Sequence, residues 1–489
     1  MVFRQASWDE PLLIELSRKG RCGLTLPSDP ELSKEVGDVL ETVPKNLRRE
    51  DIKLPDVAQP QIIRHYTRLS QMNYAVDLGT YPLGSCTMKY NPKIIKRIIS
   101  NARFNTIHPE EPEEYVQGLL KILFELGTML AEIVGLPKFS LQPAAGAQGE
   151  FTGVLMIRAW LEDRGQLGTR NEILIPDTAH GTNPASAVMA GFKVVKIPST
   201  KEGVLDIEAV KAVAGRSTAG MMMTVPNTLG LFEKDVKEVI GIIHDAGGLM
   251  YYDGANMNAL IGRVRPGDIG FDIAHLNLHK TFGTPHGGGG PGAGPIFTTE
   301  ELSEYLPTPI LEFDGCRYRW NYNRPKSVGR VRSYFGNTSV LIGAYIYCLL
   351  LGRDGLRDTS ALATLAANYL MSRLDRRYFD IQCPSNIPCK HEFVASSKAS
   401  ALDVAKLLLE HGVHPPTIYF PITIPEAIMI EPTESESLEE LDHYAKALNE
   451  AARVAYENPK AAAEAPRNTA VARVDEVKAS HPRTLKVRW

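Results

Sequence analysis

The middle of the chain alternates between short apolar runs and longer segments in which apolar residues recur at helical spacing. Between residues 139 and 300, a helical pattern separates most of the apolar runs from one another. The strand candidates are residues 172–175, 193–198, a run ending near Val225, a run ending at Asp253, residues 271–278 and the segment PIFTT. Strands joined by helices in this way indicate a largely parallel sheet covered on both faces. The pattern therefore predicts an α/β domain.

Helical patterns dominate on both sides of this region. Glu113–Val134 carries apolar residues at intervals of three and four, with glutamates in its first turn, which is typical of an amphipathic helix. After about residue 340 the runs SVLIGAYIYCLLLG and ALATLAANYLMSRL are again helical in pattern. Strand-like HEFVAS, a helix in ALDVAKLLLEHG and a last helix capped by Thr433 or Ser435 follow. A smaller α+β region is therefore expected after the α/β domain.

Proline content and composition divide the chain into four expected segments. Residues 1–75 are punctuated by prolines, which break long helices, and are expected to form an arm with short helices. Residues 76–340 are expected to form the large α/β domain, and residues 341–457 the small C-terminal α+β domain. Residues 458–489 are rich in alanine, proline and charge, so we expect an extended tail.

Charge and hydropathy exclude two function classes. The 489 residues include 54 basic and 57 acidic side chains, with a net charge of −3, which argues against nucleic acid as the main partner. The longest apolar stretch, residues 340–351, contains Gly343 and falls short of the ~20 residues that a bilayer requires. We therefore expect neither a nucleic-acid partner nor a membrane partner.

The N-terminus and the cysteines indicate the compartment. The opening residues MVFRQASWDEPLL lack a long apolar segment, so secretion is not expected. The six cysteines are scattered and form no C-x-x-C pair, which fits neither a disulfide framework nor a zinc site. We expect a cytoplasmic protein with no metal.

Candidate chemistry is concentrated in residues 271–295. An apolar run, Phe271–Leu278, ends in His279 and Lys280, and the glycine-rich segment Gly287–Gly294 follows. Burial disfavours the charged ammonium, so a lysine here is expected to be an amine nucleophile suited to Schiff-base chemistry. Glycines allow the backbone to approach a bulky ligand. The alternative is a surface lysine beside a flexible loop.

Three other polar residues stand at the carboxyl ends of predicted strands, where ligands bind in open α/β sheets: His180, Asn227 and Asp253. Each has a simpler explanation when taken alone. Asp253 is suited to a turn because Gly254 follows it, and Asn227 to the start of one. His180 is also compatible with an ordinary loop histidine. Their order along the chain makes the combination harder to dismiss than its members.

These residues fit one cofactor, pyridoxal 5'-phosphate. It requires a lysine for its aldehyde, an anion site for its phosphate and a carboxylate for its pyridinium nitrogen. Lys280 would form the covalent bond and Asp253 would hold the nitrogen. The phosphate would bind the free N–H groups of a helix start at Gly146, Ala147 and Gln148.

Three residues are expected around the cofactor ring. His180 would lie flat on one face of the ring, with Ala255 on the other side. Asn227 would hydrogen-bond the ring hydroxyl. The glycine turn before the helix start is also common as a plain helix cap, so the phosphate site alone is a weak signal.

The segment AVDLGTYPLGSCTMKYNPK, residues 75–93, gathers small hydroxyl and thiol side chains between prolines. Such residues suit a polar pocket, but an ordinary turn-rich connection has the same composition. The candidates for contact with a substrate are Ser85, Cys86, Thr87 and Arg332. Arg332 is equally suited to a structural salt bridge.

The order of these features resembles the fold type I, aspartate-aminotransferase-like pyridoxal-phosphate enzymes. The sequences of its motifs are most similar to those of the P-protein (glycine decarboxylase) family of the glycine cleavage system. The matching segments are LGSCTMKYNP, QPAAGAQGE, DTAHGTNPASA, TVPNTLGLFE, YYDGANMNA, DIAHLNLHKTFGTPHGGGGPGAGP, SVGRVRSYFGN and DEVKASHPRTLKVRW. They extend from about residue 40 to the end of the chain.

The resemblance implies a fold type I large domain with a mostly parallel seven-stranded sheet and a smaller C-terminal α+β domain. Members of the family are either one chain of two homologous halves or two separate subunits, and this chain is similar to the lysine-bearing second subunit. The implied partners are the homologous subunit 1, in a heterotetramer of two copies of each, and the lipoylated H-protein.

The resemblance also implies the reaction. Glycine would replace Lys280 on the cofactor and lose CO2, and the aminomethyl group would pass to the lipoyl arm of the H-protein. The implied catalytic residues are Lys280, Asp253 and His180. His279 would contact the phosphate or assist proton transfer.

Three alternatives stay open from the sequence. Another fold type I enzyme, such as an aminotransferase or a carrier-independent amino-acid decarboxylase, would keep Lys280 and Asp253 and change the substrate. A non-catalytic scaffold subunit would have no need of Lys280. A nucleotide-binding enzyme would use Gly287–Gly294 as its phosphate loop, although G-x-x-x-x-G-K-[ST] is absent from that segment.

Overall fold

The computed structural model describes residues 3–25, 29–37, 41, 43–49, 52–287, 292–384 and 387–485. The chain forms two compact units. One, called the terminal unit below, contains Met1–Ala75, Leu409–Gly412 and Glu464–Trp489. The other, called the main unit, contains Val76–Leu408 and Val413–Ala463. The N-terminal arm and the C-terminal tail therefore belong to the same unit.

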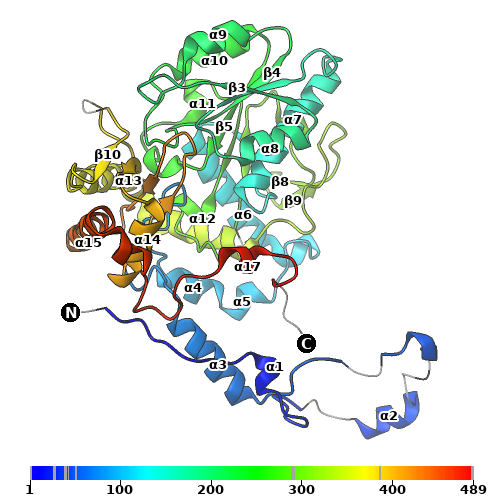
Figure 1. Cartoon of the computed structure of the whole chain (residues 1–489). Coiled ribbons are helices and arrows are strands. Elements are labelled where there is room, and N and C mark those ends of the chain that lie inside the picture. The colour runs from blue at the N-terminus through cyan, green and yellow to red at the C-terminus, as the bar shows by residue number, and fades with distance from the viewer. Residues whose placement is uncertain are drawn as a thin grey trace. The chain divides into compact units, whose positions relative to one another are not determined.

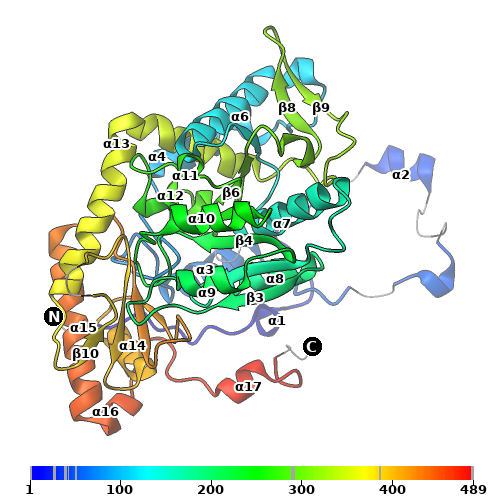
Figure 2. The same cartoon turned by 90° about the horizontal axis from the view of Figure 1, so that it is seen from above.

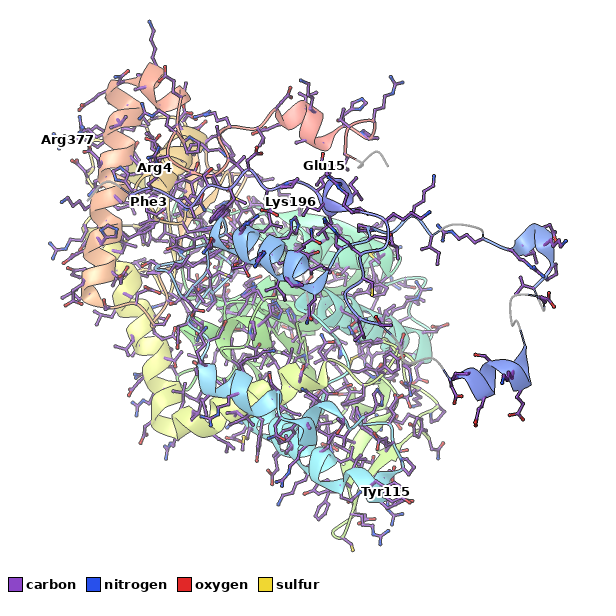
Figure 3. The ribbon with its side chains drawn as sticks, turned by 90° about the horizontal axis from the view of Figure 1, so that it is seen from below. Phe3, Arg4, Glu15, Tyr115, Lys196 and Arg377 are labelled. Carbon is purple, nitrogen blue, oxygen red and sulfur yellow. The ribbon has the colours of Figure 1, made fainter. Side chains whose placement is uncertain are left out.

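Short helices and extended segments make up the terminal unit. Its helices are α1 (Leu13–Leu16), α2 (Pro30–Val36), the 3-10 turn η2 (Lys45–Leu47), α3 (Gln59–Gln71) and α17 (Glu476–Ser480). The Glu10 carboxylate accepts hydrogen bonds from His65 and Arg68 of α3, each at 2.9 Å. Near the N-terminus, Asn468 Nδ2 donates to the carbonyl of Phe3 at 2.7 Å, and Figure 3 labels Phe3 on this segment. The Glu10 contacts stabilise the arm, and the bond of Asn468 to Phe3 joins the two ends of the chain.

The main unit is built on a seven-stranded sheet in the order β1-β7-β6-β5-β4-β2-β3. The strands are β1 (Lys138–Ser140), β2 (Glu172–Pro176), β3 (Lys193–Ile197), β4 (Thr218–Thr224), β5 (Leu249–Gly254), β6 (Ile273–Leu276) and β7 (Ile296–Thr298). Strands β3, β2, β4, β5 and β6 pair in parallel, and β7 is antiparallel to β6 and β1. This confirms the predicted mostly parallel seven-stranded sheet.

Helices cover both faces of this sheet (Figure 1). The helices of this part of the main unit are α4 (Lys93–Ile99), α5 (Ala102–Asn105), α6 (Glu113–Val134), α7 (Gly146–Asp163), α8 (Thr182–Met189), α9 (Ile207–Val213), α10 (Val236–Asp245), α11 (Pro266–Ile269), α12 (Leu278–Thr281) and α13 (Thr338–Ser372). Two 3-10 turns, η3 (Met257–Ala259) and η4 (Ser303–Tyr305), and a hairpin of β8 (Ile310–Phe313) and β9 (Tyr318–Asn321) complete the layer.

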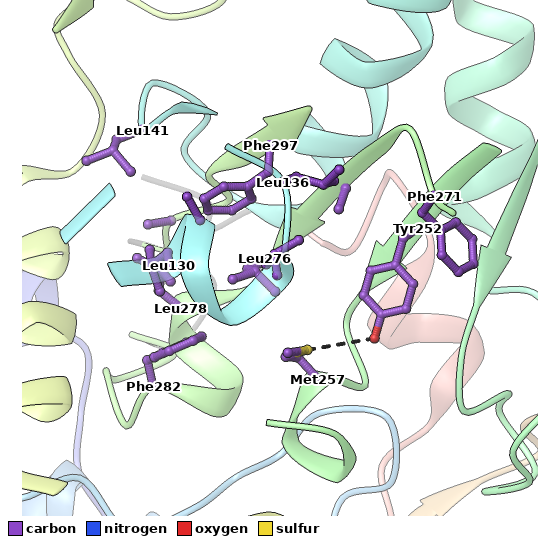
Figure 4. Close-up of a cluster of buried hydrophobic side chains, with 14 of the residues drawn as sticks. Leu130, Leu136, Leu141, Tyr252, Met257, Phe271, Leu276, Leu278, Phe282 and Phe297 are labelled. Carbon is purple, nitrogen blue, oxygen red and sulfur yellow. Dashed lines mark hydrogen bonds between the residues drawn. The ribbon is translucent and has the colours of Figure 1, made fainter. Parts of the chain in front are cut away.

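Neighbouring residues of β5 point into opposite layers because side chains alternate along a strand. Tyr252 packs edge-on against Phe271 in the core that includes the α6 leucines, and its hydroxyl contacts the Met257 sulfur at 3.9 Å (Figure 4). Tyr251 instead joins Val154 and other residues of α7 in the opposite core. Both faces of the sheet therefore pack against apolar cores, and its polar groups lie mainly at the carboxyl ends of the strands.

A second sheet forms the small domain. Its four strands, in the order β10-β11-β13-β12, are all antiparallel. The elements are β10 (Phe379–Ile381), β11 (Phe393–Ser397), β12 (Thr417–Ile418), β13 (Ala427–Ile430), α14 (Ala401–Glu410), α15 (Leu438–Glu457) and α16 (Pro459–Ala463). The long helix α13 runs from α6 to α15 and so connects the two sheets (Figure 2). The expected C-terminal α+β domain is confirmed.

Helix α13 is the one described helix that is long and apolar enough to cross a bilayer, judged by length and composition alone. Its first turns are buried in the core at Val340, Leu341 and Ile342. Gly352, at φ 59°, divides it into two segments, which match the two helical runs expected from the sequence. Core packing accounts for the apolar character of the first segment.

Two local expectations are wrong. The cap of α15 is Ser437, whose hydroxyl accepts the Glu440 N–H at 3.2 Å, whereas Thr433 and Ser435 hydrogen-bond each other. Ser437 is the residue with extended backbone directly before the first helical turn, which is what an N-cap requires. The tail after residue 458 was expected to be extended, but it contains α16 and α17.

Candidate active site

Lys280 lies on α12, a single helical turn directly after β6. The run Phe271–Leu278 was expected to be one strand, but β6 ends at Leu276 and the Lys280 N–H donates to the Asn277 carbonyl at 3.0 Å. Lys280 Nζ donates to the Ser85 carbonyl at 2.6 Å. The segment that the sequence singled out around Ser85 therefore lies against the lysine.

Asp253 ends β5 with its carboxylate almost fully enclosed, at 1% exposure. Oδ2 accepts from Asn183 at 3.0 Å and from Thr224 at 3.2 Å, and Oδ1 accepts the Ala255 N–H at 2.9 Å. Burial alone would raise the pKa of Asp253, but the charge of His275, these donors and Lys280 together lower it. Asp253 is therefore an ionised carboxylate beside Lys280.

A second buried carboxyl group, Glu150, accompanies Asp253. Burial and the neighbouring charge of Asp253 raise the pKa of Glu150 to about 9, so Glu150 holds a proton at neutral pH and is available as a donor to Asp253. His275 stands opposite Asp253 on β6, with Nε2 3.4 Å from Oδ1 and Nδ1 2.7 Å from the Tyr251 hydroxyl. Sequence reasoning missed Glu150 and His275, although Glu150 follows the predicted phosphate turn by one helical turn.

The start of α7 presents the free backbone N–H groups that the predicted anion site requires. Its first backbone donors are the N–H groups of Gly146, Ala147 and Gln148, and the first helical bond runs from the Gly149 N–H to Ala145 O at 2.9 Å. The Gln148 side chain fixes this turn because it accepts the Ala144 N–H at 2.6 Å and donates to the Val331 carbonyl. Helix N-termini bind phosphate through such N–H groups and the helix dipole.

Unpaired polar atoms face this anion site. Among the described residues, Asn277 Oδ1 and His279 Nδ1 are buried and have no hydrogen-bond partner. A Cβ on Gly146 would lie 2.4 Å from Asn277 Oδ1, and one on Gly292 would lie 2.8 Å from His279 Nδ1. Burial and the charges of His286 and Lys280 lower the pKa of His279 to about 3, so its ring is neutral. The orphaned groups, the N–H turn, Lys280 and Asp253 fit pyridoxal 5'-phosphate.

The three residues expected around the ring differ in their surroundings. His180 follows β2, and its Nδ1 lies 3.0 Å from the Thr182 hydroxyl; burial and Lys280 lower its pKa. Asn227 donates to Gly203 O and to Glu233, and its Oδ1 accepts the N–H groups of two leucines. These four bonds fix a turn, so a contact of Asn227 with the cofactor stays a prediction. Ala255 is placed by its bond to Asp253.

The substrate candidates fall in two places. Ser85, Cys86 and Thr87 lie on the turn next to Lys280, but Thr87 is buried and its hydroxyl donates to Glu431. Arg332 donates to Asn337 Oδ1 at 2.9 Å, and Asn337 in turn donates to the Gly292 carbonyl, beside His279. Arg332 is therefore linked through Asn337 to the backbone of Gly292, next to His279. Its contact with substrate stays a prediction.

The glycine-rich segment Gly287–Gly294 is only partly described, because residues 288–291 lie outside the described residues. At its end, a Cβ on Gly294 would lie 2.0 Å from the Ala145 carbonyl, and the Gly294 N–H donates to Pro143 O at 2.9 Å. Gly294 is thus required for close packing against the turn before α7. This contact favours a supporting role for Gly294 over an independent nucleotide site.

The seven-stranded sheet, Asp253 at the end of β5, the lysine after β6 and the helix start at Gly146 define a fold type I pyridoxal-phosphate enzyme. The family model described as "Glycine cleavage system P-protein" matches residues 33–313, and "Glycine dehydrogenase, C-terminal domain" matches residues 359–471. The chain belongs to the glycine cleavage system P-protein family.

Curated relatives match along the whole chain. "Probable glycine dehydrogenase (decarboxylating) subunit 2" of Pyrococcus furiosus is 54% identical, over 98% of this chain and 96% of that protein. The protein of the same name in Thermoplasma acidophilum is 50% identical, over 100% of both chains. None of these names is that of an aminotransferase.

Solved structures support the fold. The crystal structure of glycine decarboxylase (P-protein) of the glycine cleavage system, in inhibitor-bound form, superposes with a TM-score of 0.75 at 23% identity. It covers 88% of this chain and 100% of that chain. A Lactobacillus brevis glutamate decarboxylase superposes with a TM-score of 0.65 at 14% identity, over 86% and 98% of the two chains.

Proposed function

We propose that this chain is the lysine-bearing subunit of a two-subunit glycine decarboxylase. It removes CO2 from glycine and passes the aminomethyl group to the lipoyl arm of an H-protein. The relatives named glycine dehydrogenase (decarboxylating) subunit 2 over the whole length support this activity. The observation that carries it is the meeting of Lys280, ionised Asp253 and the α7 N-terminus around one site.

Pyridoxal 5'-phosphate is the cofactor, covalently bound to Lys280. When bound, it draws electrons from the bond between the α-carbon and the carboxylate of glycine. The N–H groups of Gly146, Ala147 and Gln148 would hold its phosphate, near the neutral ring of His279. Asp253 would hold the ring nitrogen, and His180, Ala255 and Asn227 would contact the ring.

The protein's own groups set the electrostatics. Ionised Asp253 keeps a proton on the ring nitrogen, and the protonated Glu150 beside it donates towards Asp253 and steadies that charge. Lys280 would supply the amine that links to the cofactor, and the Ser85 carbonyl, which accepts from Lys280 Nζ at 2.6 Å, would hold that amine when it is free. Decarboxylation requires that the bond to the carboxylate stand perpendicular to the ring, so the walls around Ser85, Cys86 and Arg332 orient the substrate.

The expected partners are the homologous subunit 1, as two copies of each subunit in a heterotetramer, and the lipoylated H-protein. The "subunit 2" in the relatives' names supports the first of these. We also propose a cytoplasmic location. All six cysteines, each within the described residues, are free thiols, as suits a reducing compartment.

Substitution of Lys280 by alanine tests the function. We expect Lys280→Ala, produced together with subunit 1, to lose the absorbance band of the lysine-bound cofactor and the glycine-dependent exchange of labelled bicarbonate. In the wild type, CO2 release should increase when the lipoylated carrier is added. Exchange at the wild-type rate in Lys280→Ala would show that the assignment is wrong, and amino transfer to a keto acid without carrier would favour an aminotransferase.

A further inference from the structure

The segment Leu83–Lys89, called the strap below, belongs to the main unit and runs along the small domain. Leu83 forms an antiparallel bridge with Ile430, and the Gly84 N–H donates to the Met429 carbonyl at 3.2 Å. A Cβ on Gly84 would lie 2.0 Å from the Met429 side chain, so only glycine fits there. The strap therefore pairs with β13 of the small domain's sheet and leads from there to Lys280.

The strap turns sharply beside Lys280. Ser85 and Thr87 have φ values of 66° and 47°, in the left-handed region that residues other than glycine rarely adopt. Such a conformation persists only where the surroundings impose it. The Ser85 carbonyl, which accepts from Lys280, and the Cys86 thiol are both placed by this turn.

Two carboxyl groups of the small domain impose the turn. Glu392 Oε2 accepts the Ser85 N–H at 2.6 Å, and Glu431 Oε2 accepts the Thr87 N–H at 2.9 Å. Glu431 Oε1 also accepts the Thr87 hydroxyl. N–H groups of left-handed turns form concave anion sites, and here the protein fills that site with its own carboxyls. Both glutamates are fully buried.

The two glutamates are neighbours across paired strands. Glu392 precedes β11 and Glu431 follows β13, at the paired positions Phe393 and Ile430. Burial raises the pKa of both carboxyl groups, and the nearby Glu431 raises the pKa of Glu392 further. The positive charges of Lys280 and Lys89 counteract this effect. The N–H groups of Ser85 and Thr87 in the strap stabilise these two buried carboxyl groups next to each other.

A buried histidine lies beside this pair without joining it. His391 Nε2 is 3.9 Å from Glu392 Oε1 and 3.8 Å from Glu431 Oε1. Burial and the charges of Lys280 and Lys89 lower the pKa of His391 to about 3, so its ring is neutral. The same two lysines create a positive field that opposes a cation at this cluster. Three of the four carboxyl oxygens instead accept hydrogen bonds from the strap, and Glu392 Oε1 accepts from Asn256 at 3.2 Å.

The far end of the strap is tied to the helix that carries Lys280. Lys89 Nζ donates to Glu434 of the small domain and to the Thr281 carbonyl of α12, at 2.5 and 2.8 Å. It also donates to Asn258 Oδ1 at 2.7 Å. The strap is therefore fastened to the small domain at its turn and to α12 at its end.

We propose that Glu392 and Glu431 are positioning residues that fix the Gly84–Thr87 turn over Lys280. Through this turn, the small domain determines where the Ser85 carbonyl and the Cys86 thiol stand relative to the reacting amine. The proposal rests on the proposed function only in taking Lys280 as that amine. It explains why the LGSCTMK segment, whose chemistry alone indicated no role, lies at this place.

Reactivity of the Cys86 thiol in the full chain without cofactor measures the turn directly. We expect Glu431→Gln to increase the labelling rate of Cys86 by an alkylating reagent on the order of tenfold, because the amide nitrogen of glutamine cannot accept one of the two Thr87 hydrogen bonds that Glu431 accepts. Cys389, buried in the same small domain, should keep its slow rate. Labelling of both thiols together would indicate general unfolding of the small domain and would overturn the proposal.

Thr87→Val tests the same hydrogen bond from the other side. Valine keeps the β-branched shape at φ 47°, so the backbone strain is unchanged while the hydroxyl is removed. We expect Thr87→Val to increase the labelling rate of Cys86 and Thr87→Ser to keep the wild-type rate. The double variant Thr87→Val/Glu431→Gln should label Cys86 only slightly faster than either single variant, because both remove the same hydrogen bond. Fully additive effects would contradict a shared bond.

The matched control is Glu436→Gln. Glu436 is a partly buried glutamate of the small domain that accepts the Thr80 hydroxyl at 2.9 Å, before the strap begins. We expect its Cys86 labelling to equal that of the wild type. An increase as large as in Glu431→Gln would show that any lost glutamate loosens the region, and the proposal would fail.

A second readout separates this proposal from the proposed function. On addition of pyridoxal 5'-phosphate to the full chain, the absorbance band should form several-fold more slowly in Glu392→Gln and Glu431→Gln than in the wild type. A wild type that forms no band would refute the proposed function and leave the thiol results standing. Variants that form the band and label Cys86 at wild-type rates would refute the positioning role alone.

Discussion

Two buried carboxyl groups near Lys280 have different protonation states, and this difference assigns their roles. Asp253 receives three hydrogen bonds, from Asn183, Thr224 and the Ala255 N–H, and its pKa is lowered. Glu150 accepts no such donors among the described residues, and its pKa is raised to about 9. Pairs of neighbouring groups whose environments push their pKa values apart commonly divide the work of a site. Asp253 is the anion and Glu150 is the neutral donor.

Asp253→Asn tests the anion. Asparagine keeps the shape and can retain the hydrogen bonds to Oδ1 and Oδ2 in part, but it carries no charge to hold a proton on the ring nitrogen. We expect cofactor still to bind Lys280, while glycine decarboxylation falls roughly 10²–10³-fold, as when one electrostatic stabiliser is removed. The absorbance band and bicarbonate exchange measure the two effects separately. Unchanged turnover would remove Asp253 from the mechanism.

Glu150→Gln tests the neutral donor through pH. The pKa of Glu150 is about 9 in the folded chain against an ordinary value of 4.5, so its stabilising contribution is full below about pH 4.5 and is lost as pH rises through 9. Glutamine mimics the protonated form and does not titrate. We therefore expect the Tm of the wild type to fall more between pH 5 and 9 than that of Glu150→Gln. Parallel Tm curves for the two proteins would show that Glu150 is ionised.

At the scale of elements, the start of α7 depends on a residue without a side chain. A Cβ at position 146 would lie 2.4 Å from Asn277 Oδ1, which is buried and cannot move freely. We expect Gly146→Ala to weaken retention of pyridoxal 5'-phosphate on the order of tenfold, because the N–H turn must shift. Dialysis followed by absorbance measures the loss. Gly241→Ala, in α10 where nothing lies within 4 Å of the new Cβ, should retain cofactor like the wild type.

The elements that the sequence predicted well are those with a strong period and a clear end. α6 spans Glu113–Val134 as expected, because its apolar residues repeat at helical spacing and Gly135 ends it in the left-handed conformation. α12 was missed because the apolar run 271–278 has no period that separates a buried strand from a strand followed by a helical turn. The sequence therefore predicted correctly that Lys280 follows the strand after Asp253, but it placed Lys280 at the end of a strand, whereas Lys280 lies on the helical turn α12.

The candidate site was predictable where ligand groups follow strands, and unpredictable where they come from the small domain. Asp253, His180 and Lys280 follow β5, β2 and β6, so topology alone gathers them at one edge. Glu392 and Glu431 contact Ser85 and Thr87 across 307 and 344 residues of sequence. Carboxyl groups beside ordinary strands carry no signal of such a contact, and only packing of the second sheet reveals it.

At the scale of the whole molecule, several large apolar side chains are exposed on helices of the chain. In the main unit, Val188 and Met189 of α8 are 61% and 71% exposed, and Leu365 of α13 is 64% exposed. In the terminal unit, Ile63 of α3 is 60% exposed. Such exposed apolar side chains are compatible with the proposed pairing with a homologous subunit.

The chain alone should therefore be poorly active. Because its exposed helix faces would be covered by subunit 1, we expect bicarbonate exchange by the isolated chain to be at least about tenfold below that of the mixture. Titration with subunit 1 should raise activity to a plateau at equal numbers of the two subunits, with a matching shift in mass by light scattering. A mixture of subunit 1 with the Lys280→Ala variant of this chain should form the same assembly and give no exchange. Full activity of a monodisperse lone chain would show that its site is complete without a partner, and the exposed apolar faces would then need another explanation.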